Sequence, residues 1–173
     1  FPVTGNVLFR GMTTVREGRF NFSFIVPLDI NYTYGKGAIK YYAWDGTDDI
    51  NGSFSGITVG GFSDEAMDDR EGPEIRLFMN DTLFREGGVT DDAPVLLVLL
   101  SDRSGINATG TGIGHDIIAW LDDDISSAVV LNSLFRSDVG VHSSGSLAYP
   151  LLIPERGEHT VTLRAWDNLN NPS

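Results

Sequence analysis

The chain contains no cysteine, and this absence removes much of the chemistry that a protein of 173 residues can carry. No thiol nucleophile, disulfide or cysteine-ligated metal centre can form. The three histidines, His115, His142 and His159, are scattered along the sequence, and no G-x-S-x-G motif accompanies them. The residues therefore do not predict a nucleophilic hydrolase, and we expect neither a catalytic site nor an organic cofactor in this chain.

Paired carboxylates are the next candidates for chemistry, because a glycosidase uses two of them on either side of the bond that it cleaves. The chain holds 24 acidic residues, so neighbouring acids are expected on solvated loops by number alone. Nothing in the sequence marks one of them as buried, and we therefore expect no catalytic carboxylate. The adjacent pairs are Asp48/Asp49, Asp68/Asp69 and Asp91/Asp92.

One acidic turn has the composition of a calcium-binding loop. Calcium prefers several oxygen ligands, and the segment 45–52 (DGTDDING) is rich in them. The segment lacks the closing glutamate of an EF-hand loop. A solvated hairpin turn, in which Asp and Asn side chains cap their own backbone, accounts for the same residues and is the favoured interpretation. The calcium candidates are Asp45, Asp48, Asp49 and Asn51.

Two further features suggest binding or turn formation. Ten Phe, five Tyr and three Trp are enough for a sugar-stacking surface, but core packing is the commoner position of tryptophan, and the sequence leaves open which face of each strand is wet. The segment 112–117 (GIGHDI) indicates a tight turn in which a histidine ring nitrogen bonds to the backbone. The residues of this structural turn are Gly112, Gly114, His115 and Asp116.

The elements that position these residues are predicted to be strands. Apolar and polar residues alternate with a period of two, and no segment shows a sustained helical stripe. The run 95–100 is apolar throughout, which fits a central strand or the start of a buried helix, and its length favours the strand. At most one short helix is expected, near 81–86. Strands are expected at 20–26, 39–43, 95–100, 117–121 and 161–165.

The segment 62–73 divides the chain, because it is polar, carries five carboxylates against one arginine, and ends in Gly-Pro. The tripeptide Ala-Trp-Asp occurs on each side of it, at 43–45 and 165–167, each time after an alternating segment and before an Asn-rich turn. This internal echo favours two related β-modules, over 1–66 and 67–173. The first module has only about four expected strands, few beside the seven of an immunoglobulin fold, so it is predicted to be incomplete by itself.

Composition excludes several partners. The formal net charge is −12, which lacks the basic footprint that nucleic acid or an anionic lipid surface requires. The longest apolar run, 94–100, is far shorter than the roughly 20 residues of a membrane-spanning helix, so no membrane insertion is expected. The chain begins Phe-Pro without an initiator Met, and we interpret it as a fragment of a longer protein.

Several motifs together resemble one family. Their order and spacing are similar to the region that follows the peptidase domain in the gingipain-like cysteine peptidases, above all in the sortases of the type IX secretion system of Bacteroidetes. The likeness covers nearly the whole chain. The segments that carry it are 20–43, GPEIRLFMND (72–81), GGVTDDAP (87–94), SDRSGIN (101–107), GIGHDI (112–117) and HTVTLRAWDNLNN (159–171).

The resemblance implies an all-β chain whose second module, from about Gly72 onward, is an immunoglobulin-like β-sandwich. Family members are exported to the outer-membrane surface, cleave the C-terminal signal of cargo proteins, and transfer the cargo to anionic lipopolysaccharide. They use a Cys nucleophile and a His general base. Because this chain has no cysteine, the dyad is absent and none of its histidines is assigned a catalytic role. A final strand is expected after the Asn-rich turn at the end of the chain.

Two functions follow as hypotheses. In the first, the chain is a non-catalytic region that positions the peptidase domain and the C-terminal region of its parent protein at the cell surface. Its partners would be those two regions, with other type IX secretion proteins or cargo as further partners. In the second, it is a glycan-binding or adhesive module. Exposed, coplanar aromatic rings would favour the second function, and burial of Trp44, Trp120 and Trp166 would favour the first.

Overall fold

The computed structural model describes residues 7–63, 67–153 and 155–173, and nearly all of its regular structure is β. The first part of the chain forms one antiparallel hairpin, made of β1 (Gly35–Trp44) and β2 (Asp49–Val59), with a register shift between Gly37 and Ile39. Alternation along β1 places its two lysines, Lys36 and Lys40, on the same face as Tyr42 and Trp44. All four of these side chains are exposed.

The strand that we expected at 20–26 does not form. Apolar and polar residues alternate along it, but no strand of the described residues pairs with its backbone, and a single strand lacks the inter-strand hydrogen bonds that stabilise a sheet. The segment is extended, and its phenylalanine rings stack on one another. The ring centroids of Phe20 and Phe22 are 6.3 Å apart, as are those of Phe22 and Phe24, and Phe9 stacks on Phe24 at 4.6 Å.

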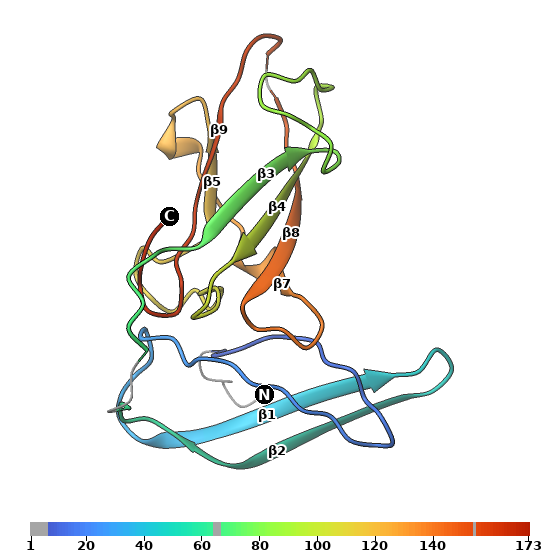
Figure 1. Cartoon of the computed structure of the whole chain (residues 1–173), viewed down its shortest axis with the longest axis vertical. Helices are drawn as coiled ribbons and strands as arrows, with labels where there is room; N and C mark the ends of the chain where they lie inside the picture. Colours follow the sequence, from blue (N-terminus) through green and yellow to red (C-terminus); the bar gives the residue numbers. More distant parts are fainter. Residues whose placement is uncertain (1–6, 64–66, 154) are drawn as a thin grey trace.

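The second part of the chain is built from two antiparallel sheets (Figure 1), which confirms the all-β prediction. The first sheet has the order β3-β4-β8-β7, and the second has the order β6-β5-β9. The strands are β3 (Glu74–Met79), β4 (Val95–Ser101), β5 (Ile118–Leu121), β6 (Val129–Val130), β7 (Arg136–Ser137), β8 (Ser144–Pro150) and β9 (Val161–Arg164).

The core lies between these two sheets. Strand β4 is central, and every second residue of it, Leu96, Val98 and Leu100, is fully buried, whereas the residues between them are half-buried. The opposite sheet contributes Ala119 and Leu163 to the same core. The apolar run of β4 is therefore a strand, as predicted, covered completely on one face and partly on the other.

Among the described residues, helical structure is limited to two short 3₁₀ turns, η1 (Ile125–Ser127) and η2 (Asn132–Leu134). The helix that we allowed at 81–86 is instead a turn, in which the Asp81 side chain accepts a hydrogen bond from the backbone N–H of Leu83 at 2.7 Å. Asp at the start of such a segment competes with helix formation by bonding to nearby backbone. No helix of the described residues is long and apolar enough to cross a membrane.

The hairpin lies crosswise beneath one end of the sandwich (Figure 1). The segment before β1 is attached to the turn after β9 by three hydrogen bonds. Leu28 N–H donates to the Asn168 carbonyl at 2.8 Å, and Asn168 Nδ2 donates to the Ile25 carbonyl at 3.0 Å. Asn170 Nδ2 donates to Asp29 Oδ1 at 3.1 Å. Beyond β9, Ala165 and Ser173 exchange backbone hydrogen bonds of 3.2 and 3.0 Å. The end of the sandwich that faces the hairpin therefore holds the residues that decide how the two parts meet.

Candidate functional site

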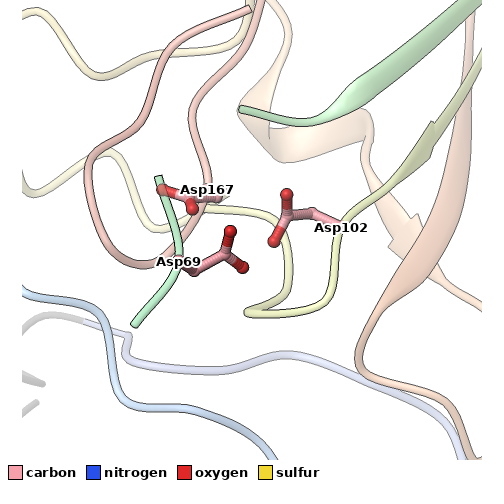
Figure 2. A group of neighbouring side chains, drawn as sticks. All are labelled: Asp69, Asp102 and Asp167. Carbon is pink, nitrogen blue, oxygen red and sulfur yellow. The ribbon is translucent and has the colours of Figure 1, made fainter. Parts of the chain in front are cut away.

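Three carboxylates meet at the end of the sandwich nearest the hairpin (Figure 2). Asp69 precedes β3, Asp102 follows β4, and Asp167 follows β9. One oxygen from each lies within 4.8 Å of an oxygen of both others. Among the residues that the structure describes, this is the group of three or more acids and histidines close enough to share one ion.

Asp167 is the most buried residue of this acidic cluster: it is 0% exposed, and four donor groups lie within hydrogen-bond distance of its carboxylate. Its Oδ1 accepts from the backbone N–H groups of Leu169 at 2.9 Å and Asn171 at 2.6 Å. Its Oδ2 lies 2.8 Å from the Asn171 amide and 3.0 Å from the hydroxyl of Ser104, both of which are donors. The side chain thus shapes the turn that follows β9 and ties it to the turn that follows β4.

Asp102 lies at the mouth of the cluster. Its Oδ1 accepts hydrogen bonds from the backbone N–H of Ser104 at 2.6 Å and from the Ser104 hydroxyl at 2.7 Å. Burial raises the pKa of the Asp102 carboxyl above its ordinary value, and the negative charges of Asp167 and Asp69 raise it further, against the lowering effect of the Ser104 bonds. An open cleft of about 800 Å³ borders Asp102 and Asp69 and connects them to solvent.

Asp69 completes the cluster with one oxygen that has no partner. Its Oδ1 accepts from the backbone N–H of Glu71 at 3.3 Å, whereas Oδ2 is buried and accepts no hydrogen bond. Its backbone carbonyl accepts from Asn171 Nδ2 at 3.0 Å, so the amide of Asn171 bridges two members of the cluster. No arginine or lysine of the described residues forms an ion pair with any of the three carboxylates.

A further carboxylate outside this cluster, that of Asp29, joins the hairpin part of the chain to the sandwich. Its Oδ2 accepts from Asn107 Nδ2 at 2.7 Å, and its Oδ1 accepts from Asn170 Nδ2 at 3.1 Å. His115 Nδ1 lies 2.9 Å from Oδ2, and the His115 ring packs on Trp166 with the centroids 4.2 Å apart. One side chain therefore contacts two loops of the sandwich: the β4–β5 connection, through Asn107 and His115, and the turn after β9, through Asn170.

The structural turn that we expected at Gly112, Gly114, His115 and Asp116 lies beside Asp29. The backbone N–H of His115 donates to the Gly112 carbonyl at 3.3 Å, and Gly114 has a φ of +82°. The His115 ring nitrogen meets a carboxylate, not a backbone group as we had expected. A Cβ atom at Gly112 would collide with the Asp29 carboxylate and the His115 ring, so this close approach requires glycine.

The calcium candidates of the sequence, Asp45, Asp48, Asp49 and Asn51, lie at the tip of the hairpin and are not brought into the acidic cluster. Asp45 Oδ1 accepts from the backbone N–H groups of Thr47 and Asp48, both at 2.9 Å. These bonds lower the pKa of Asp45, with the bond from Asp48 contributing most. Calcium binding at these residues stays a prediction, and the observed contacts are those of a self-capped turn.

The Ala-Trp-Asp echo corresponds to a shared turn. Asp45 accepts hydrogen bonds from the backbone N–H groups two and three residues later in the sequence. Asp167 accepts them from the backbone N–H groups two and four residues later, and each aspartate closes the turn after its strand. They differ in burial: Asp45 is exposed, and Asp167 is fully buried. The sequence marked Asp167 by the Ala-Trp-Asp repeat, whereas it placed Asp69 in the polar segment 62–73 and Asp102 only in the segment 101–107 of the family resemblance, and neither was a site candidate.

The tryptophans do not behave as one set. Trp44 is 68% exposed on β1, whereas Trp120 and Trp166 are half-buried. The parallel aromatic rings belong to phenylalanines, and they stack on one another instead of forming an open platform. The aromatic residues therefore satisfy neither of the two patterns that would separate a positioning module from a glycan-binding module.

A hydrogen-bonded pair, His159 and Asp122, joins the residue after β5 to the segment before β9. His159 Nδ1 lies 2.7 Å from Asp122 Oδ2, and its Nε2 lies 2.9 Å from the Glu155 carbonyl, so both ring nitrogens face acceptors. The Asp122 bond, followed by the Glu155 bond, raises the pKa of His159. A backbone bond from Thr160 and the bond from His159 lower the pKa of Asp122.

This pair predicts a pH-dependent contribution to stability. The stabilisation that His159 contributes is complete below its ordinary pKa of 6.5 and is lost as the pH rises through its raised pKa in the folded chain. The stabilisation that Asp122 contributes is present above its ordinary pKa of 3.8 and is lost as the pH falls through its lowered pKa in the folded chain. We expect His159→Gln to lower the Tm more at pH 5.5 than at pH 8.5. A Tm difference that is the same at both pH values contradicts this, and Asp122→Asn should abolish the pH dependence.

Comparison with known proteins gives one informative likeness. No family of known proteins matches the chain, and no curated protein matches it. Among solved structures, the chain matches the crystal structure of dimeric latent PorU from Porphyromonas gingivalis with 34% sequence identity and a TM-score of 0.60. The chain is similar to a region of PorU. The match covers 97% of this chain but only 16% of the PorU chain.

The likeness to PorU supports the family resemblance of the sequence motifs at the level of one region. It extends over both the hairpin and the sandwich. Because the chain spans about a sixth of PorU and has no cysteine, it is not itself a cysteine peptidase.

Proposed function

We propose that the chain is a non-catalytic region of a type IX secretion sortase, which positions the peptidase domain and the C-terminal region of its parent protein for cargo processing at the cell surface. The observation that carries this proposal is the 34% identity to PorU over 97% of the chain, in a sequence without cysteine. The strand order of the larger sheet supports an immunoglobulin-like sandwich as the scaffold. The protein would be exported, and it would act at the outer-membrane surface or outside the cell.

Positioning requires that the two parts of the chain hold a fixed relation. The contacts of Asp29 with Asn107, Asn170 and His115 supply such a joint, because they connect one point before the hairpin to three residues in two loops. The Asp29 side chain is only 8% exposed, so these bonds are poorly accessible to competing water. A domain attached to the hairpin would then keep its orientation relative to a domain attached to the sandwich.

Asp29→Ala tests this joint. It should lower the free energy of unfolding of the chain by about 2 to 4 kcal/mol, because it leaves two amides and a histidine without their buried partner. In the longer parent protein it should slow cleavage of cargo several-fold. Asp48→Ala, at the exposed tip of the hairpin, is the matched control and should change neither quantity. Destabilisation of the chain with undiminished cargo cleavage by a folded parent variant would argue against a positioning role.

The gene that encodes this chain gives a second test of the proposed function, because it shows which domain adjoins the chain. A reading frame that encodes a peptidase domain with Cys and His, joined to this chain, would support it, and an unrelated neighbouring domain would contradict it. This observation does not depend on the behaviour of any variant.

One observation favours the alternative, a glycan-binding or adhesive module. Trp44 and Tyr42 are 68% and 65% exposed, and they share a face of β1 with Lys36 and Lys40. Aromatic rings beside cationic groups suit an anionic sugar. Calorimetric titration with lipopolysaccharide sugars separates the two functions, since the absence of heat would exclude the adhesive function for the sugars tested.

A further inference from the structure

A cavity lies where the segment before β1 runs along the sandwich. It is lined by residues 7–10 together with residues of the sandwich, and its volume is about 310 Å³, within the range of small-ligand sites. Two hydrogen bonds hold this stretch of chain in place: Ser137 Oγ donates to the Arg10 carbonyl at 3.4 Å, and the Gly140 N–H donates to the Met12 carbonyl at 2.7 Å. Figure 1 shows the segment between the hairpin and the sandwich.

Two side-chain amides that line the cavity each keep one buried polar atom without a partner. Asn132 Oδ1 accepts from the backbone N–H of Ile117 at 2.9 Å, and Asn132 Nδ2 donates to none of the described residues. Asn168 is 6% exposed; its Nδ2 donates to the carbonyls of Ile25 and Ser104 at 3.0 and 2.9 Å, and its Oδ1 accepts from none of the described residues. Neither amide can be flipped without losing these bonds, so one buried donor and one buried acceptor are left over.

The other lining residues favour a ligand that is largely apolar and carries no positive charge. No acid lies among the described residues that line the cavity, although the chain has 24 acids, and Arg10 is the residue of fixed positive charge there. A ligand in this space exchanges much of its water shell for apolar walls. The apolar side chains of the wall include Leu8, Phe9, Phe24, Ile106, Ala108 and Phe135.

We propose that this cavity binds an extended peptide, which inserts an apolar side chain between segment 7–10 and the sandwich. Peptide groups supply both missing partners, because a peptide carbonyl accepts from Asn132 Nδ2 and a peptide N–H donates to Asn168 Oδ1. A pyranose fits these walls less well, since several of its hydroxyls would face apolar side chains without a partner. This inference rests on the cavity alone and does not depend on the proposed function.

The test is binding of a blocked amino acid to the whole chain, followed in its amide NMR spectrum. N-acetyl-leucine N-methylamide carries one apolar side chain between two peptide groups. It should shift the side-chain NH₂ signals of Asn132 and Asn168 and the backbone signal of Thr109, with a Kd on the order of 1 to 10 mM. N-acetyl-glycine N-methylamide lacks the side chain, so it should bind about tenfold more weakly or less.

Three outcomes of this titration overturn the proposal. The absence of any shift at about 30 mM leucine amide would leave the cavity to ordered water. Shifts confined to the signals of β1 would place the peptide on the hairpin. Shifts of the Asn132 and Asn168 signals with N-acetylglucosamine, and not with the leucine amide, would make the cavity a sugar site.

Asn132→Asp tests the donor. Its Oδ1 can still accept from the Ile117 N–H, but a carboxylate cannot donate to a peptide carbonyl, so binding of the leucine amide should weaken about fivefold or more. Asn51→Asp makes the same change on an exposed side chain of the hairpin and should bind as the native chain does. Native affinity in Asn132→Asp would contradict the proposal.

Ala108→Leu tests the space independently of the amides. Ala108 is half-buried and lines the cavity, so the larger side chain should occupy the volume that the ligand's side chain takes and weaken binding about tenfold or more. Ala38→Leu, exposed on β1, is the matched control and should leave binding unchanged. Unchanged affinity in an Ala108→Leu variant whose amide spectrum is that of the folded chain would refute this site.

Discussion

Asp167→Ala lowers the free energy of unfolding by about 3 to 5 kcal/mol, the range expected when a buried charged partner is removed from its donors. The alanine leaves four donors around the former carboxylate: the backbone N–H groups of Leu169 and Asn171, the Asn171 amide and the Ser104 hydroxyl. The backbone groups cannot turn away without opening the turn after β9. Relief of repulsion from Asp69 and Asp102 offsets only part of this loss.

Urea unfolding at pH 7, in EDTA and followed by tryptophan fluorescence, measures this effect free of any bound ion. Asp167→Asn is the matched variant: its Oδ1 can still accept from Leu169 and Asn171, so its cost should be clearly smaller than that of alanine. If alanine and asparagine cost the same, the turn bonds are not the source of the stability. A cost below about 1 kcal/mol for alanine would mean that the turn reorganises around the gap.

Leu96→Ala is the second large effect, with an expected loss of about 2 to 5 kcal/mol from the removed apolar surface and the cavity that remains. Leu96 is 0% exposed and belongs to the core shared by both sheets. Leu97→Ala makes the same chemical change one residue along β4, on the half-buried face. It should cost roughly half as much or less, because less surface is withdrawn from water there.

The comparison between these two leucines tests the register of β4. Strand β4 pairs with β3 and β8 so that Leu96 lies opposite Met79 and Tyr149. A shift of register by one residue would exchange the two faces of the strand. Equal costs for Leu96→Ala and Leu97→Ala, measured by urea unfolding, would therefore contradict the arrangement of the larger sheet.

These leucines also show how far the sequence reaches. The run 95–100 could be predicted as a strand from its length and its flanking residues, but six apolar residues in a row carry no alternation to mark the core face. Which face is buried depends on the sheet that covers it. Conversely, the clear alternation of 20–26 did not produce a strand, because pairing requires a neighbouring backbone that periodicity does not reveal.

The candidate site was less accessible to sequence reasoning than the fold. Asp69, Asp102 and Asp167 lie in three distant segments, and they meet only because β4 and β9 belong to facing sheets that end at the same place. The sequence has 24 acidic residues, and many pairs of them are closer together in sequence than these three, so nothing in the sequence singled out this group. The Ala-Trp-Asp repeat did mark Asp167, but as a sign of related modules and not of a shared turn.

The position of the lysines has a practical consequence for mapping how this chain contacts other proteins. Lys36 and Lys40 are the only lysines of the sequence, and both are exposed on the same face of β1. Lysine-directed cross-linkers will therefore react with lysines of the hairpin and not with the sandwich, which has no lysine. Carboxylate-directed reagents will sample both halves, because residues 62–173 carry 19 of the 24 acids and the hairpin tip also exposes Asp45, Asp48 and Asp49, so a contact seen by the lysine chemistry alone is specific to the hairpin.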